Sequence, residues 1–353
     1  MTDPAPVILF AYNRPEHTAR ALDALAANDL AAASSLTVFC DGPAAPEDRD
    51  LVEAVRAVAR EKARGFREVR VVERDRNLGL ARSIITGVDE TLAHHEAVIV
   101  VEDDLVTSPH FLQFMNAGLR RYRDDDRVIS VCGYRFPVEG ALPDSYFLPG
   151  AFCWGWGTWR WEWALFEHDQ HRAFAEILRR NLVYEFDFQG SDPLTKIFQR
   201  SLFPQENVDS WALRWMATAC IHGKLALYPG ETLVFNGGFD GTGRHAKFND
   251  RFESPMAQRP MEVEEIPVKP SPVAVPKCVN LFRRWHVKEG GTRPVRAYFA
   301  LARYLPQSVQ KAIYTALVRR GIEKRAARKA PDASGAELAR LVGRSTDEWT
   351  DRP

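Results

Sequence analysis

The chain has 353 residues and a formal net charge of zero, with 45% apolar and 27% charged residues. This length and composition predict a globular protein with one large or two modest domains and exclude wholesale disorder. No apolar run reaches the roughly 20 residues that span a bilayer. The N-terminal VILFAY lacks the basic lead of a signal peptide, so we expect a cytoplasmic protein. Five cysteines without CxxC spacing predict buried free thiols.

Strands and helices alternate over the first 134 residues. Apolar runs end at polar or glycine residues, and the segments between them carry apolar residues at helical spacing. Such alternation predicts an α/β fold with a parallel sheet covered by helices on both faces. The predicted strands cover residues 6–12, 35–42, 68–75, the run from Ala97, and 128–134, and the predicted helices begin near Pro15, Pro46, Leu78 and Ser108.

The run AVIVVEDDL, from Ala97 to Leu105, is the centre of the predicted sheet. Its β-branched residues predict a strand buried on both faces, and Glu102, Asp103 and Asp104 follow where that strand ends. Ligands of open α/β sheets bind beyond these strand ends. Three adjacent acids repel one another, and a divalent cation that prefers oxygen ligands would compensate them. A solvated acidic turn is the alternative.

Other polar residues join the acids at the same edge of the sheet. Asn13 and Arg14 follow the first strand and Asp41 follows the second. This set outlines a nucleotide site, since a ribose is bound by carboxylates and a diphosphate by a metal ion. The P-loop and the GxGxxG fingerprint are absent, which argues against NTPases and dinucleotide dehydrogenases. The glycine-rich basic loop of sugar nucleotidyltransferases does not follow the first strand either.

The segment GAFCWGWGTWRWEWALFE, residues 150–167, holds five of the nine tryptophans. Large aromatic side chains stabilise cores, and we expect Trp159 and Trp163 to pack in one. Trp154 and Trp156 are predicted to form a platform for sugar rings, with packing as the alternative.

Two later segments carry candidate chemistry. NVDSWALRWMATA, residues 207–219, predicts a helix entered through Asp209 or Ser210, so Asp209 is either a helix cap or a functional acid. The glycine-rich stretch that ends in Arg244 and His245 is predicted to fold over a phosphate, with a flexible hairpin as the alternative.

The C-terminal part is strongly basic. Residues 277–329 contain fourteen Lys or Arg against Glu289 and Glu323. Val309, Ile313 and Leu317 recur every four residues, which predicts amphipathic helices that lie on an anionic membrane surface. Packing of these helices on the rest of the protein is the alternative, and no nucleic-acid partner is expected.

These motifs, in this order, resemble GT-A-type nucleotide-sugar glycosyltransferases, and more closely the bacterial relatives of N-acetylglucosaminyltransferase I. The resemblance runs from Val7 to about His245. It is carried by LFAYNRPEHTARALDAL, RNLGLARSI, VVEDDLVTSPHFLQFM, GWGTW, VDSWALRW and LYPGETLVFNGGFDGTGRH.

The resemblance implies a GT-A (Rossmann-like), mostly parallel sheet with a C-terminal helical extension. It implies that Asp104 ligates Mn²⁺ or Mg²⁺ on the donor diphosphate and that Asp209 is the catalytic base of an inverting transfer. The donor would be a UDP-sugar, for example one of GlcNAc type, and the acceptor a glycan or a lipid-linked saccharide. The residues that would contact the donor are Ala11, Tyr12, Arg14, Asp41, Arg82, Glu102 and Asp103.

The same motifs predict the division of the chain. Its donor-binding half is residues 1–134, its acceptor-binding and catalytic half 135–254, its proline-rich linker 255–276, its basic helical region 277–330 and its flexible tail 331–353. Two other functions stay open on this fold, because a fold does not secure an activity. They are a non-catalytic nucleotide-sugar- or carbohydrate-binding protein and a sugar nucleotidyltransferase.

Overall fold

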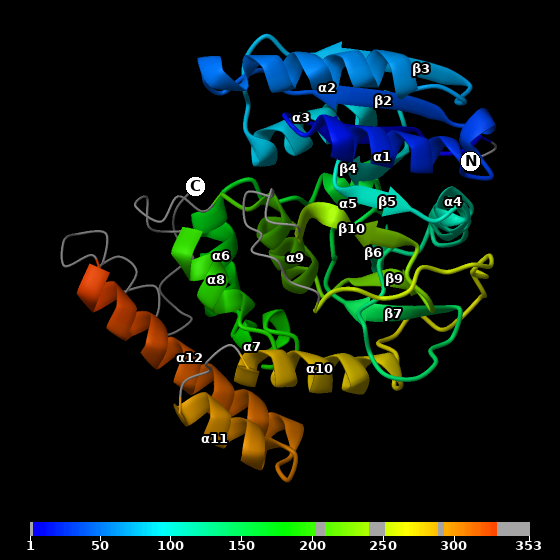
Figure 1. Cartoon of the computed structure of the whole chain (residues 1–353). Coiled ribbons are helices and arrows are strands. Elements are labelled where there is room, and N and C mark those ends of the chain that lie inside the picture. The colour runs from blue at the N-terminus through cyan, green and yellow to red at the C-terminus, as the bar shows by residue number, and fades with distance from the viewer. Residues whose placement is uncertain (1–2, 202–208, 240–250, 289–292, 330–353) are drawn as a thin grey trace. The chain divides into compact units, whose positions relative to one another are not determined.

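A computed structural model describes residues 3–201, 209–239, 251–288 and 293–329. The chain divides into two compact units (Figure 1). Unit 1 comprises Met1–Leu165 and Leu225–Ala274, and unit 2 comprises Phe166–Lys224 and Val275–Pro353. In the described part of the chain, no helix combines the length and apolar character needed to cross a membrane.

Unit 1 contains a mixed sheet whose described strands follow the order β3-β2-β1-β4-β8-β6-β9-β7. β3, β2, β1 and β4 are mutually parallel, and β6 and β9 are parallel to each other. β8 is antiparallel to both β4 and β6, and β7 is antiparallel to β9. The strands are β1 (Val7–Ala11), β2 (Ser35–Cys40), β3 (Glu68–Glu73), β4 (Ala97–Glu102), β6 (Val128–Cys132), β7 (Ser145–Pro149), β8 (Trp156–Trp159) and β9 (Leu225–Pro229).

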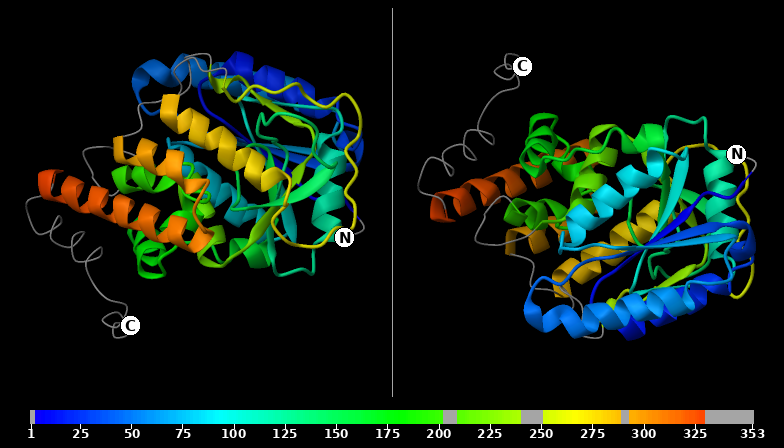
Figure 2. Two further views of the ribbon diagram at one scale, coloured as in Figure 1. Left: turned by 90° about the horizontal axis from the view of Figure 1, so that it is seen from below. Right: turned by 90° about the horizontal axis from the view of Figure 1, so that it is seen from above.

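Helices cover both faces of this sheet, which confirms the predicted fold class. Figure 2 shows α1 and α2 on one side of the first strands and α3 on the other. Helix α2 buries Val52, Val55 and Ala59 at helical spacing. Gly87 of α3 lies against the rings of Phe10 and Phe39, where a Cβ would overlap with them. The helices of unit 1 are α1 (Pro15–Ala26), α2 (Arg49–Lys62), α3 (Leu80–Leu92), α4 (Phe111–Arg121) and α5 (Arg160–Trp163).

The tryptophan-rich segment supplies strand β8, which lies between β4 and β6. Successive residues of a strand point to opposite faces of the sheet. Trp159 therefore lies on the α4 side, where its indole N–H donates to the Leu119 carbonyl at 3.0 Å. Trp156 lies on the other side and packs on Trp163. Trp159 and Trp163 are both buried, as predicted.

Strand β4 is followed at once by a short antiparallel ribbon. The ribbon pairs β5 (Leu105–Thr107) with β10 (Val234–Asn236), and the Gly237–Phe239 3-10 helix follows β10. Strand β4 itself is buried over its first five residues, as expected of a central strand. The three acids therefore lie between a buried parallel strand and a tight ribbon.

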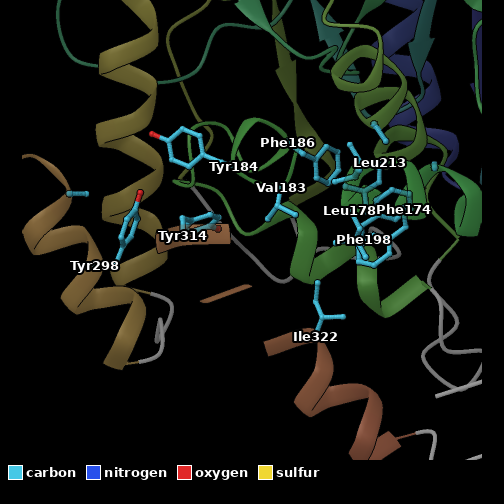
Figure 3. Close-up of a cluster of buried hydrophobic side chains, with 14 residues drawn as sticks. Phe174, Leu178, Val183, Tyr184, Phe186, Phe198, Leu213, Tyr298, Tyr314 and Ile322 are labelled. Atoms are coloured by element: carbon cyan, nitrogen blue, oxygen red, sulfur yellow. The ribbon is translucent and has the colours of Figure 1, made fainter. Parts of the chain in front are cut away.

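Unit 2 is helical around an apolar cluster (Figure 3). Phe174, Phe198 and Leu213 pack there together with Tyr314 and Ile322 from the basic C-terminal region. That region forms the predicted helical extension. The helices are α6 (Gln170–Arg179), α7 (Val183–Phe186), α8 (Leu194–Ser201), α9 (Trp211–Ile221), α10 (Ala274–Lys288), α11 (Arg293–Ala302) and α12 (Gln307–Lys329).

Candidate functional site

The acidic triplet lies at the point where the strand order of the sheet reverses. The chain runs outward from β1 to β2 and β3 and then returns to β4 on the other side of β1. Glu102 ends β4 opposite Phe10, and the Asp103 amide donates to the Phe10 carbonyl at 3.0 Å. The crevice at such a switch point is where open α/β sheets bind ligands.

Arg14 is the counter-charge of the two aspartates. It immediately precedes Pro15, so the connection from β1 to α1 carries it to the edge where β4 ends. Its Nη2 atom forms ion pairs with Asp103 Oδ1 and, at 3.1 Å, with Asp104 Oδ2. A single guanidinium thus bridges two of three adjacent carboxylates, which leaves the cluster net negative when all three are ionised.

The electrostatics of the triplet favour a further cation. Loss of hydration and the carboxylate of Asp104 raise the pKa of Glu102. Burial also raises the pKa of Asp103, although Arg14 opposes this shift. Asp103 Oδ2 is buried and has no hydrogen-bond partner among the described residues. A divalent cation beside these oxygens would reduce the repulsion between the carboxylates and would give Asp103 Oδ2 a partner.

The triplet would offer an oxygen-preferring metal ion only part of its ligand shell. Within residues 3–201, 209–239, 251–288 and 293–329, no three Asp, Glu, His or Cys side chains converge into a complete metal-binding group. Mg²⁺ is usually bound through one or two carboxylates together with substrate phosphates, so an incomplete protein shell suits it. Asp104 and its neighbours would therefore suit a cation that also binds substrate phosphates better than a cation whose ligands all come from the protein.

Asp41 organises the loop on the other side of β1. Its Oδ1 accepts from the Leu78 amide at 2.9 Å and its Oδ2 from the Gly79 amide at 3.2 Å. Asn77 Nδ2 donates to the Gly42 carbonyl at 2.8 Å. These bonds fix the turn that begins α3. Both oxygens of Asp41 are thus engaged by backbone, and its predicted role in nucleotide binding stays a prediction.

Asp48 is a residue of this edge that sequence reasoning missed. The Tyr12 hydroxyl donates to Asp48 Oδ2 at 2.8 Å and accepts from the Ala44 amide at 3.0 Å. Asn13 Nδ2 donates to Asp48 Oδ1 at 3.3 Å. Asp48 thereby fastens the segment after β1 to the segment after β2. Its only sequence signal was an acid shortly after Pro46, which is also common in a first helical turn.

Ala11 and Arg82 are the two remaining residues that are predicted to contact the UDP-sugar donor. Ala11 is buried at the end of β1, and its carbonyl accepts from the Asp41 amide at 2.9 Å. Arg82 lies in the first turn of α3 and is exposed. Their donor contacts stay predictions.

The segment after β10 approaches the triplet closely. The Gly237 amide donates to the Asp104 carbonyl at 2.8 Å. A Cβ on Gly238 would overlap with Asp104 Oδ2, so glycine allows this close approach without displacement of the carboxylate. The predicted phosphate-binding residues Arg244 and His245 lie outside the described residues. Gly237 and Gly238, which begin the same glycine-rich stretch, lie at the triplet.

The two tryptophans predicted as a sugar platform differ in accessibility. Trp154 is half-buried among the rings of Tyr134, Phe239 and Phe252. Trp156 is only 1% exposed, because strand pairing turns its ring under Trp163. Trp156 therefore has no open ring face in this structure, which corrects its predicted place in a platform, and the platform prediction rests on Trp154 alone.

Asp209 belongs to unit 2, whereas the triplet belongs to unit 1. Ser210 caps α9, since its Oγ accepts from the Leu213 amide at 3.3 Å. Asp209 is therefore not the cap. Its Oδ1 accepts from Arg214 Nη2 at 2.8 Å, and its side chain is 63% exposed. The structure thus gathers Arg14 and the triplet in one place and leaves Asp209 as an accessible carboxylate held at a helix start.

No family model and no curated protein sequence matches the chain. Among solved structures, the chain is similar to a UDP-glucose pyrophosphorylase complexed with UDP-glucose. The two are 10% identical, with a TM-score of 0.31 over 65% of this chain and 91% of the other. At that score the likeness carries no information about activity.

Proposed function

We propose that this chain is a metal-dependent glycosyltransferase that uses a UDP-sugar donor. The observation that carries the proposal is the acidic triplet at the β1–β4 switch point. There, Asp103 Oδ2 is buried without a hydrogen-bond partner among the described residues, and one arginine pairs with two carboxylates. The motif resemblance described above supports the choice of transferase.

The proposed donor site combines the triplet with the loops at the same edge. Asp104 would hold Mn²⁺ or Mg²⁺, with Glu102 and Asp103 beside it. The bound cation would neutralise charge that develops on the leaving diphosphate. Arg14 would keep the two aspartates in place before the cation binds. The turn held by Asp41 would shape the crevice for the nucleoside.

Asp209 is the proposed general base. An exposed carboxylate can accept the proton of an acceptor hydroxyl as that oxygen attacks the sugar. Attack from the face opposite the leaving diphosphate inverts the configuration at the sugar carbon. Arg214 keeps the carboxylate oriented through Oδ1. The proposed acceptor is a glycan or a lipid-linked saccharide.

The deciding experiment measures donor binding to the full chain and to Asp104→Asn. We expect a UDP-sugar with Mn²⁺ to stabilise the parent protein, by about 2.7 kcal/mol at a hundredfold excess over the dissociation constant. The variant should lose this stabilisation, because it lacks a metal-ligating charge. Asp124→Asn is the control, since Asp124 is an exposed acid of the same unit. Equal stabilisation of both variants would move the donor site elsewhere.

Product analysis separates the proposed activity from the alternatives. A glycosyltransferase releases UDP when an acceptor is present. A sugar nucleotidyltransferase consumes the UDP-sugar only with pyrophosphate and forms UTP. Donor binding without either reaction, across a panel of glycan and lipid-linked acceptors, would indicate a binding protein.

A further inference from the structure

The last two helices of unit 2 have a buried inner side. Tyr298 of α11 and Tyr314 and Ile322 of α12 are between 2% and 4% exposed (Figure 3). Tyr314 is anchored further by its hydroxyl, which donates to Asp187 Oδ2 at 2.8 Å. These contacts fix both helices on unit 2, and their other sides are therefore held in a definite orientation.

The outer side of the same helices is apolar where they meet. Leu301 is 61% exposed, Tyr304 71%, and Val309 and Ile313 39% each. Val309 and Ile313 are one helical turn apart, so they share a face of α12. Leu301 is at the end of α11 and Tyr304 in the connection to α12. An outward helix face is normally polar, so these exposed apolar side chains form a surface that no other described residue of unit 2 covers.

Cations border the patch. Residues 294–325 contain seven Lys or Arg and a single acid, Glu323. Arg303 is exposed and lies over the Tyr304 ring, 4.7 Å from its centroid. Arg320 is exposed and follows Ile313 by two helical turns, which places it further along the same face. Exposed apolar and cationic side chains therefore lie close together in the sequence at the end of α11 and along α12.

We propose that this surface, made by Leu301, Tyr304, Val309, Ile313 and the flanking Arg303 and Arg320, docks on an anionic lipid bilayer. Leu and Ile side chains enter the boundary between headgroups and acyl chains, and tyrosine concentrates at that depth. Arginines beside them meet the negative surface potential of anionic lipids. Attachment is peripheral and does not depend on the function proposed for unit 1.

The positive charge of this surface favours a lipid bilayer over a second copy of the chain as its partner. A twofold pairing would bring the same patch of each copy together and set its arginines against one another. Anionic headgroups instead complement these charges while the apolar side chains leave water. The patch therefore matches a lipid surface better than it matches itself.

The test is co-sedimentation of the full chain with vesicles. One set is phosphatidylcholine, and the other contains about one third phosphatidylglycerol. We expect the parent protein to pellet with the anionic vesicles, and to be released when salt rises from about 0.1 M to about 0.5 M. The double variant Leu301→Ser/Tyr304→Ser should bind at least about tenfold more weakly, because two anchoring side chains are lost.

Matched controls are available in the same chain. Leu51 and Val69 of unit 1 are 46% and 37% exposed, and their replacement by Ser should leave vesicle binding unchanged. Ile313→Gln is an independent second variant on α12 and should also weaken binding. Circular dichroism and thermal unfolding check that each variant is folded as the parent is.

Three results would overturn the proposal. One is equal pelleting with neutral and anionic vesicles, and another is unchanged binding by the folded double variant and by Ile313→Gln. The third is a dimer in sedimentation velocity that the double variant abolishes, because the surface would then belong to a second copy.

Discussion

Replacement of Gly238 by alanine tests the packing of the glycine-rich segment against the acidic triplet. The added Cβ would lie about 1 Å inside ordinary van der Waals contact with Asp104 Oδ2. It would also lie 3.1 Å from Asn236 Oδ1. Neither Gly238 nor its neighbour Gly237 has a positive φ, so steric overlap and not backbone strain disfavours alanine at position 238.

The expected effects on stability and on ligand binding differ. The Asp104 carboxylate ends a short side chain and can rotate away, at about 0.5–1.5 kcal/mol for an off-rotamer side chain. Alanine also lowers the conformational entropy of the unfolded chain, which stabilises the folded state by about 0.4–1 kcal/mol. We therefore expect less than about 1 kcal/mol of net destabilisation. A ligating oxygen must stay within about 0.2 Å of its metal distance, so the same rotation should remove it from a metal site.

Calorimetric titration with a UDP-sugar and Mn²⁺ measures the second effect, and chemical denaturation measures the first. We expect metal-dependent donor binding to weaken by at least about tenfold in Gly238→Ala, a size typical of disturbed metal shells. Gly237→Ala is the matched control, since its Cβ would be 3.6 Å from the Asp104 carbonyl oxygen, in ordinary contact. Equal donor binding by the two variants would contradict the proposal that Asp104 holds the metal ion.

Two further predictions concern unit 2. Asp209→Asn should keep its folding stability, because the amide oxygen still accepts from Arg214, but should lower glycosyl transfer by about 10²- to 10⁴-fold. Ser210→Ala removes the α9 cap, so it should lose about 1 kcal/mol of stability and keep its turnover. Burial raises the pKa of Asp187 to about 7, so its folded pKa exceeds its unfolded value near 4. The stabilising contribution is therefore complete below about pH 4 and is lost as pH rises to about 7, by up to about 1.4 kcal/mol per pH unit. Calorimetric unfolding at a series of pH values should show this slope in the parent and not in Asp187→Asn; a slope that persists in the variant would assign it to another group.

The sequence predicted the parallel half of the sheet well because the signals there are local. β1, β2, β3 and β4 each lie within the predicted strands, since an apolar run bounded by turn residues depends on few distant contacts. The positions of Arg14, Asp41 and the triplet at one edge followed from the same alternation, because parallel strands share their carboxyl ends.

Strand β8 could not be predicted from local sequence patterns. GWGTW has no clear two-residue period of apolar and polar residues, and its antiparallel place between β4 and β6 depends on residues far away in the chain. The burial of Trp156 follows from that pairing alone. A composition rich in tryptophan fits a binding platform and a core equally well until the strand direction is known.

The sequence by itself determined the α/β class, the central acidic strand and the helical character of the basic C-terminal region, because each depends on periodicity within a short segment. Only the tertiary structure decided that Gly238 lies against Asp104, that Asp48 joins two loops, and that α12 buries Tyr314 while exposing Ile313. These arrangements join residues far apart in the chain or choose between two apolar faces of one helix. Such choices depend on which surfaces meet in the folded state, and no local pattern of residues encodes them.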